Sequence, residues 1–174
     1  IPDVLNDIRA IQTRHVLFVD DNFIGDTDYT KELLKYMRLM KLKWGAAVTA
    51  DVADDPELFD RMAEAGCRCL FIGFESVNPA SLESVHKKNK AERYDRVVQE
   101  IHSRGIMINA SMVFGLDGDN ADVFSKTLDW LVKSKISTLT SHIMTPYPGT
   151  GLYKRLEEAG RITDYDLAKY NTAN

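Results

Sequence analysis

The chain has 174 residues, of which 44% are hydrophobic and 28% are charged, and its formal net charge is −4. This length allows one domain with a substantial core. The mild acidity and the dispersed basic residues give no reason to expect a nucleic-acid surface. No apolar run approaches the roughly 20 residues that a membrane helix needs. We therefore expect a single domain over residues 1–174 whose partner is a small molecule.

Apolar, strand-like segments recur along the chain at regular intervals. The first, third and fourth of them are rich in β-branched or aromatic residues, which favour strands. In chain order the five candidates are HVLFVD (15–20), KWGAAVT (43–49), CLFIGF (69–74), IMINASMVF (106–114) and STLTSHIM (137–144).

Helical patterns fill the intervals between these strand candidates. Asp55 is placed to cap a helix with Pro56 in its first turn and Gly66 just beyond its end. His86 and the two lysines that follow it are expected to form a solvated helix end. The expected helices cover residues 29–41, 54–66, 78–82, 92–105, 122–134 and 151–162, and residues 1–13 resemble the end of a further helix.

Alternation of strands and helices predicts a parallel sheet with right-handed crossover connections. A complete eightfold barrel typically takes about 250 residues, so the pattern leaves open a doubly wound sheet or part of a barrel. In both architectures ligands bind at the carboxyl ends of the strands. Those ends are therefore the place to look for chemistry.

Each expected strand is followed by a carboxylate, a hydroxyl or a Gly/Pro turn. One such ending has an ordinary explanation, because Asp and Asn also cap helices and form turns. Five endings on one edge of a sheet favour a shared polar site. They are Asp20-Asp21-Asn22, Thr49-Ala50-Asp51, Glu75-Ser76, the turn FGLDGD (114–119) with Gly115, Asp117 and Gly118, and TPYPGT (145–150) with Thr145 and Tyr147.

Two further residue types bear on the site. Glu75 directly follows an apolar strand, where a carboxylate needs a partner, and His142 within the last strand can face the same interior. Cys67 and Cys69 lack the spaced pairs of a zinc or cluster site, so we expect them to pack as small apolar side chains. Their free thiols favour a reducing, cytoplasmic compartment.

Five sequence blocks in this order resemble the radical S-adenosylmethionine (SAM) enzymes. The blocks are FVDDNF, DDPELF, AGCRCLFIGFESVNPASL, RGIMINASMVFGLDGD and TPYPGTGLYKRL. The resemblance runs from about Arg14 to about Asp166, and the branch is the one whose members often carry a cobalamin-binding domain ahead of the radical domain. It implies a partial TIM-like (βα)6 barrel that lacks its first strand, with residues 167–174 starting a further segment.

The resemblance also implies roles for the residues at the strand ends. Asp20, Asp21 and Asn22 stand where the family motif meets the amino group of the methionine moiety. Glu75 and Ser76 stand where it reaches the ribose hydroxyls or the methionine carboxylate. The turn with Gly115, Asp117 and Gly118 would lie near the adenine, and Thr145 to Gly149, with Tyr147, beside the adenine or the substrate. His142 and Thr145 are the substrate-side candidates.

The chain departs from the family in one motif. The CxxxCxxC motif, which supplies three thiolates to a [4Fe-4S] cluster, is absent, and a cluster needs such ligands. We therefore expect no metal ligands in this chain, which would be a catalytically silent fragment. The resemblance implies a longer parent that binds SAM and the [4Fe-4S] cluster, with or without cobalamin, and that cleaves SAM to a 5′-deoxyadenosyl radical or methylates through cobalamin.

Two other functions stay open, along with one expectation about assembly. The chain can be a non-catalytic α/β module with a nucleotide-type site, or, more weakly, a metal-dependent hydrolase using Asp20, Asp21, Asp51 and Glu75. An incomplete barrel exposes a strand edge and apolar helix faces, so dimerisation through that edge is expected.

Overall fold

A computed structural model describes residues 1–84 and 91–172 of the chain. The helix end expected at His86 lies outside these residues. The helices are α1 (Pro2–Ala10), α2 (Thr27–Met40), α3 (Pro56–Glu64), α4 (Pro79–Ser84), α5 (Tyr94–Ser103), α6 (Asp122–Lys133) and α7 (Gly151–Glu158). The strands are β1 (His15–Leu17), β2 (Lys43–Val48), β3 (Cys67–Glu75), β4 (Met107–Phe114) and β5 (Thr138–Ile143).

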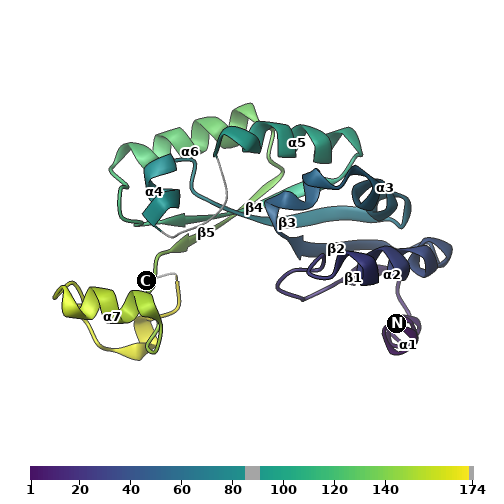
Figure 1. Ribbon diagram of the computed structural model, residues 1–174, viewed down its shortest axis with the longest axis horizontal. Coiled ribbons are helices and arrows are strands. Elements are labelled where there is room, and N and C mark those ends of the chain that lie inside the picture. The colour runs from purple at the N-terminus through teal and green to yellow at the C-terminus, as the bar shows by residue number, and fades with distance from the viewer. Residues whose placement is uncertain (85–90, 173–174) are drawn as a thin grey trace.

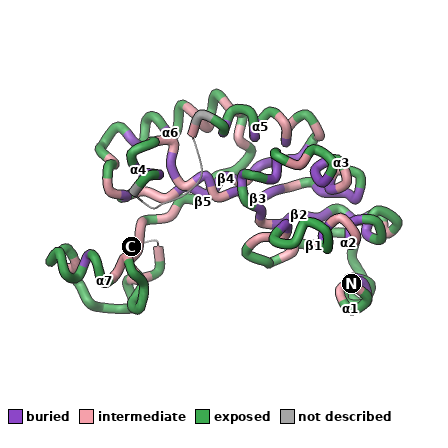
Figure 2. The backbone as a smooth tube through the Cα atoms, in the orientation of Figure 1, coloured by how far each residue is buried: buried purple, intermediate pink, exposed green. Residues whose placement is uncertain are grey.

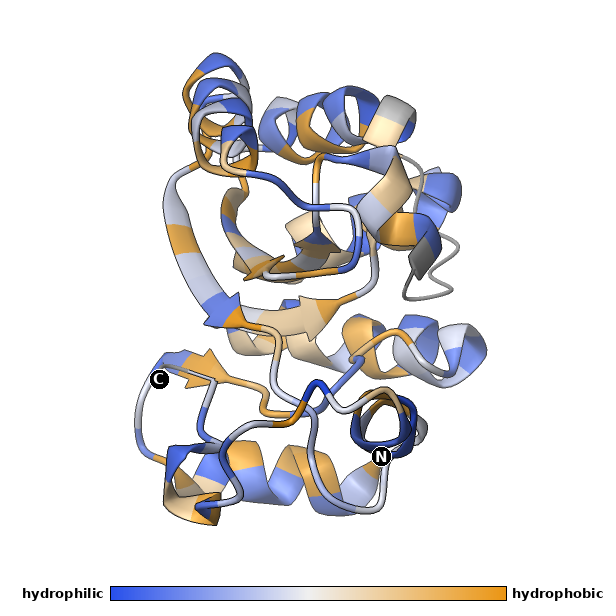
Figure 3. Cartoon of the chain, turned by 90° about the vertical axis from the view of Figure 1, so that its left-hand side faces the viewer, coloured by the Kyte–Doolittle hydropathy of each residue, from blue (hydrophilic) through white to orange (hydrophobic). Residues whose placement is uncertain are grey.

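The strands form one parallel sheet in the order β1-β2-β3-β4-β5. Helices α3, α5 and α6 lie along one side of the curved sheet, whereas α7 lies on the other side beyond the end of β5 (Figures 1 and 3). The sheet is an open half-barrel with β1 and β5 as its edges. The predicted alternation of five strands with helices, and the fold class of a partial (βα) barrel, are confirmed.

The central strand β3 shows how the sequence assigns its two faces. Leu70, Ile72 and Phe74 are fully buried under the helices, while the alternate residues are only half-buried and face the interior of the half-barrel. This follows from the two-residue side-chain period of a strand. In Figure 2 the buried backbone is concentrated in β2, β3 and β4, and α7 is mostly exposed.

Aromatic side chains join β3 to two helices and β2 to the segment after β1. Phe74 of β3 lies 4.7 Å from Tyr94 and 5.1 Å from Trp130, measured between ring centroids. A second cluster joins Trp44 of β2 to Phe18 and Phe23, at 5.7 and 5.0 Å. Such contacts add to the burial of large apolar rings, so they stabilise the packing around β2 and β3.

The first strand is shorter than the sequence predicts. It ends at Leu17 rather than at Asp20, and Val19 is 88% exposed. The apolar run was expected to be buried, but β1 is an edge strand whose inner face has no covering element in the described chain. The exposed apolar side chains expected at this edge are present.

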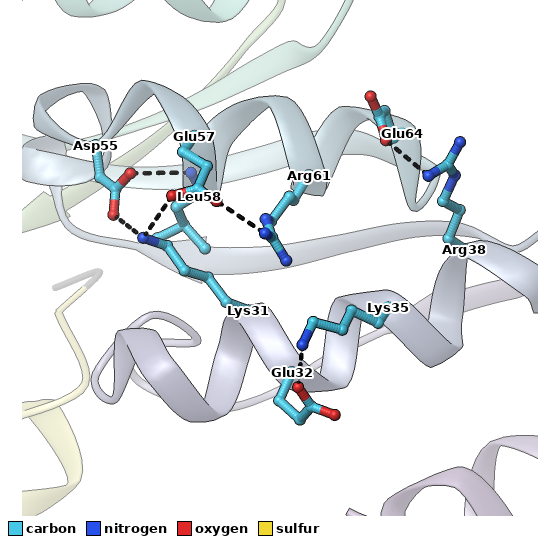
Figure 4. A network of polar contacts seen from close by, with 9 residues as sticks. All are labelled: Lys31, Glu32, Lys35, Arg38, Asp55, Glu57, Leu58, Arg61 and Glu64. Atoms are coloured by element: carbon cyan, nitrogen blue, oxygen red, sulfur yellow. Dashed lines mark hydrogen bonds and ion pairs between the residues drawn. The ribbon is translucent and has the colours of Figure 1, made fainter.

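An ion-pair network joins α2 to α3 (Figure 4). Lys31 contacts Asp55 at 2.7 Å, and Arg38 contacts Glu64 at 3.3 Å. Asp55 also caps α3, as predicted, because its carboxylate accepts a hydrogen bond of 3.0 Å from the Leu58 N–H. Each surface ion pair contributes little alone, but together they tie α2 to α3.

We expect Asp55→Asn to weaken the acid sensitivity of folding. The hydrogen bonds from Lys31 and from the Leu58 N–H hold the pKa of Asp55 below its ordinary value. A lowered folded-state pKa stabilises the fold above the unfolded pKa of about 3.9 and this contribution is lost as the pH falls through the folded value. Asn caps a helix as well as Asp does, so the variant removes the charge and keeps the cap.

Urea unfolding midpoints between pH 6 and 2.5 measure this effect. The decline towards low pH should be shallower for Asp55→Asn than for the natural chain. Asp28→Asn, an exposed residue in the first turn of α2, should decline as the natural chain does. Parallel declines for the natural chain and Asp55→Asn would contradict the assignment.

Within residues 1–84 and 91–172, none of the helices combines the length and the apolar character needed to span a bilayer.

Candidate functional site

A pocket of about 350 Å³ opens at the carboxyl ends of β3, β4 and β5. Because all five strands are parallel, their carboxyl ends share this edge of the sheet. The predicted residues that line the pocket are Glu75, His142, Thr145 and Tyr147. These residues of β3, β5 and the following loop thus meet at one pocket, which is otherwise lined mainly by apolar side chains such as Val113 and Met144.

Glu75 has an unusual backbone conformation. Its φ is +69°, in the left-handed region, which costs a residue with a Cβ atom roughly 1–2 kcal/mol. The pairing of β3 with β4 shifts here, since Gly73 pairs with Ser111 and Glu75 with the next residue, Met112. Bulges of this kind re-aim a side chain and occur beside active sites. The strain is therefore located at the one carboxylate that lines the pocket.

His142 is held by the chain segment that ends the described structure. Its Nδ1 lies 3.3 Å from Oγ1 of Thr172, and the Ile143 N–H donates a 2.8 Å hydrogen bond to the Thr172 carbonyl. The segment thus pairs with the free edge of β5 and forms one wall of the pocket. Thr172 carried no sequence signal, because only the folded chain brings it to this edge.

Ser76 does not line the pocket. Its side chain is 1% exposed, and its hydroxyl oxygen accepts a 3.0 Å hydrogen bond from the Asn78 N–H. This bond turns the chain from β3 into α4. Ser111, which the strand-end argument did not single out, does line the pocket; the two-residue alternation along β4 was the signal that could have found it.

The turn after β4 is closed by its own residues. The Asp119 carboxylate accepts hydrogen bonds of 3.0 Å from the N–H groups of Gly115 and Leu116. Gly118 has a φ of +101°, and a Cβ atom there would lie 3.3 Å from the backbone of Ala80. The conformation of the turn and its close approach to α4 therefore both require a glycine at position 118.

Asp117 faces two arginines rather than the pocket. Its carboxylate lies 2.7 Å from Arg155 and 2.7 Å from Arg161. The hydrogen bond from Arg161, and to a smaller extent the one from Arg155, holds the pKa of Asp117 below its usual range. Asp117 is therefore engaged with α7 and the segment after it, at the same edge of the sheet as Glu75.

The acidic pair after β1 lies in a short excursion of the chain. The Phe18 N–H donates to Gly45 at 3.0 Å and the Phe23 N–H to Ala47 at 2.9 Å, so the residues between leave β2 and return to it. Asp20 and Asp21 are exposed. Their juxtaposition therefore carries no burial cost, and neither lines the pocket of Glu75.

Asn22, the third residue of that motif, is more informative. Its Oδ1 atom is buried and has no hydrogen-bond partner among the described residues. A buried acceptor without a donor costs about 1–3 kcal/mol. An ammonium or other donor on a bound ligand would satisfy it.

The two cysteines belong to the opposite edge of the sheet. Cys67 begins β3 and is fully buried, which raises the pKa of its thiol to about 12. Cys69 is half-buried. In residues 1–84 and 91–172 there is no group of three or more His, Cys, Asp or Glu side chains that could hold a metal ion. These residues do not fit a [4Fe-4S] cluster, and the metal-dependent hydrolase gains no support.

Comparison with known proteins identifies the family. A family model described as the Radical SAM superfamily matches residues 1–131. The chain belongs to the radical SAM superfamily. Among curated relatives, the bacteriochlorophyllide d C-12(1)-methyltransferase of Chlorobaculum tepidum is 32% identical over 97% of this chain and 38% of its own length. The hopanoid C-2 methylase of Rhodopseudomonas palustris is 30% identical over 90% of this chain and 31% of its own.

Solved structures of radical SAM enzymes share the fold. The methyltransferase TsrM from Kitasatospora setae, solved with cobalamin and a [4Fe-4S] cluster, superposes with a TM-score of 0.77 at 20% identity, covering 91% of this chain and 33% of that one. Coproporphyrinogen III oxidase from Escherichia coli gives 0.65 at 15% identity, over 87% and 36%. The chain thus spans about a third of the relatives that it matches.

SAM, unlike the cluster, has residues here that suit it. The unpartnered Oδ1 of Asn22 and the carboxylate of Glu75 can accept hydrogen bonds from an ammonium or hydroxyl group, and Tyr147 adds an aromatic wall to the pocket of Glu75. Acceptors that carry a charge form the stronger hydrogen bonds to a cation. These hydrogen-bond acceptors at the carboxyl edge of the half-barrel are compatible with the ammonium end of SAM.

Proposed function

We propose that this chain is the SAM-binding part of the catalytic barrel of a radical SAM enzyme. The observation that carries the proposal is Glu75, held in a left-handed conformation at the mouth of β3, in a pocket that it shares with His142 and Tyr147. Strain at a pocket carboxylate is typical of a ligand-binding position rather than of a packing position.

In this proposal the residues of the chain bind and orient SAM. Asn22 and Glu75 accept hydrogen bonds from its ammonium group or ribose. Asp20 and Asp21 belong to the exposed loop that leads to Asn22, and Ser76 fixes the turn that follows Glu75. Gly115, Asp117 and Gly118 shape the turn beside the adenine, and His142 and Thr145 face the substrate. When bound, SAM supplies a methyl group or, after one-electron reduction, a deoxyadenosyl radical. The half-barrel excludes water from one side of the site.

For the whole protein we propose methyl transfer to a small organic substrate. The support is that the two relatives at 30% identity or above are both methyltransferases by name. Cobalamin is part of the proposal, since TsrM was solved with cobalamin bound. The ligands of a [4Fe-4S] cluster are proposed to lie outside the 174 residues, because the residues present do not fit one.

The products formed by the full-length protein test this function. We expect anaerobic incubation with SAM, a strong reductant and a small organic methyl acceptor to yield S-adenosylhomocysteine and the methylated acceptor in equal amounts. 5′-Deoxyadenosine alone would indicate radical chemistry without methylation, which would contradict the methyl-transfer proposal. SAM binding without either product would instead favour the non-catalytic binding module.

Four further proposals concern the domain organisation, nucleic-acid binding, location and assembly of the chain. We propose that residues 1–174 form one domain and that it does not bind nucleic acid. Two free cysteines favour a cytoplasmic location. The exposure of Leu17 and Val19, 72% and 88%, supports dimerisation through the β1 edge; sedimentation of the chain at increasing concentration measures it.

A further inference from the structure

We propose that Asp117 is a positioning residue that holds the loop carrying Thr145 and Tyr147 against the pocket. The inference rests on the proposed function only in taking that pocket as the SAM site. It differs from the role implied by family resemblance, in which Asp117 would lie among the residues that contact the cofactor.

The turn after β4 holds both ends of the loop. At the start of the loop, the Met144 N–H donates a 2.8 Å hydrogen bond to the Phe114 carbonyl, which begins the turn. At its other end the loop enters α7, where Arg155 pairs with Asp117 at 2.7 Å. The turn after β4 therefore contacts the chain on both sides of Thr145 and Tyr147, which line the pocket.

Polar contacts matter here because α7 is weakly packed. Leu156 is the one buried side chain among its residues, and the helix lies away from α3, α5 and α6 (Figures 1 and 3). A helix with so little apolar burial gains little from the hydrophobic effect. The second pair, Arg161 with Asp117 at 2.7 Å, fixes the chain just beyond α7 to the same carboxylate.

The turn after β4 is itself hydrogen-bonded to the segment that follows Glu75. The Asn78 side-chain amide donates a 2.9 Å hydrogen bond to the Gly118 carbonyl, and the Ser81 hydroxyl donates to Asp119. One turn thus joins the loop after β3 to the loop after β5. Each oxygen of Asp117 accepts from an arginine, so its influence on a ligand passes through these neighbours.

Hydrogen exchange on the full-length protein tests the proposal. We expect Asp117→Asn to raise the exchange rates of backbone amides in residues 144–154 roughly three- to tenfold, the range expected for losing exposed ion pairs. Amides of 70–72 in β3 should not change, which shows that the variant is folded. Asp122→Asn, whose carboxylate lies 3.7 Å from Lys126 on an exposed face, is the matched control and should leave both regions unchanged.

Steady-state kinetics with SAM distinguish a positioning role of Asp117 from direct contact between Asp117 and the ligand. Asp117→Asn should raise the KM for SAM with little change in kcat, and Asp117→Glu, which keeps the charge, should restore most of the loss. Unchanged exchange in residues 144–154 would overturn the proposal. A loss of SAM binding without faster exchange would place Asp117 in direct contact with the ligand, and also overturn it. The exchange result stands even if the protein proves not to bind SAM, so the two proposals can fail separately.

Discussion

Replacing Glu75 by Gln in the full-length protein is expected to weaken SAM binding about 10- to 100-fold, the loss that follows removal of a hydrogen bond to a charged group. The substitution keeps the size of the side chain and removes the charge that faces the pocket. Equilibrium dialysis with labelled SAM under anaerobic conditions measures the change. Glu83→Gln, an exposed residue of α4, is the control and should bind as the natural protein does.

The same position allows a test of backbone strain. Glu75→Ala and Glu75→Gly both remove the carboxylate, so both should bind SAM poorly. Because φ is +69°, the free energy of unfolding of the Gly variant should exceed that of the Ala variant by about 1 kcal/mol. Urea unfolding of the two variants measures this difference. Equal stability of the two variants, or full SAM binding by Glu75→Gln, would remove the basis for assigning Glu75 to the site.

Replacing Gly66 by Ala is expected to destabilise the fold by about 3 kcal/mol or more, which places it among the severe point mutations. Gly66 links α3 to β3 with a φ of +97°, and an added Cβ atom would lie 2.0 Å from the carbonyl oxygen of Leu42. That oxygen belongs to the backbone just before β2 and cannot move without disturbing the pairing of β2 with β3. Equilibrium urea unfolding measures the loss.

Gly105→Ala is the matched control for this prediction. Gly105 also follows a helix and has a φ of +68°, but nothing lies within 4 Å of the added Cβ atom. Its substitution should cost only the conformational penalty of about 1–2 kcal/mol. Similar losses for the two variants would mean that the contact with Leu42 does not govern stability at Gly66.

Sequence patterns located most of the elements because those elements depend on local and periodic features. The cap at Asp55 and the stop at Gly66 bound α3 as predicted, and the apolar run at 69–74 lies within β3 as predicted. The prediction was wrong for the end of β1, where an apolar run through Val19 is exposed. An apolar run indicates burial only if another element covers it, which the run itself does not encode.

The alternation of strands and helices by itself determined a parallel sheet and the edge where its polar residues gather, because parallel strands place all their carboxyl ends together. The half-barrel and the radical SAM family followed from the resemblance of five sequence blocks to that family. Tertiary structure alone decided which of those polar residues meet. The arginines that bind Asp117 are 38 and 44 residues away along the chain, and Thr172 reaches His142 across 30 residues. Contacts over such separations depend on where loops and α7 come to rest, which no local pattern specifies.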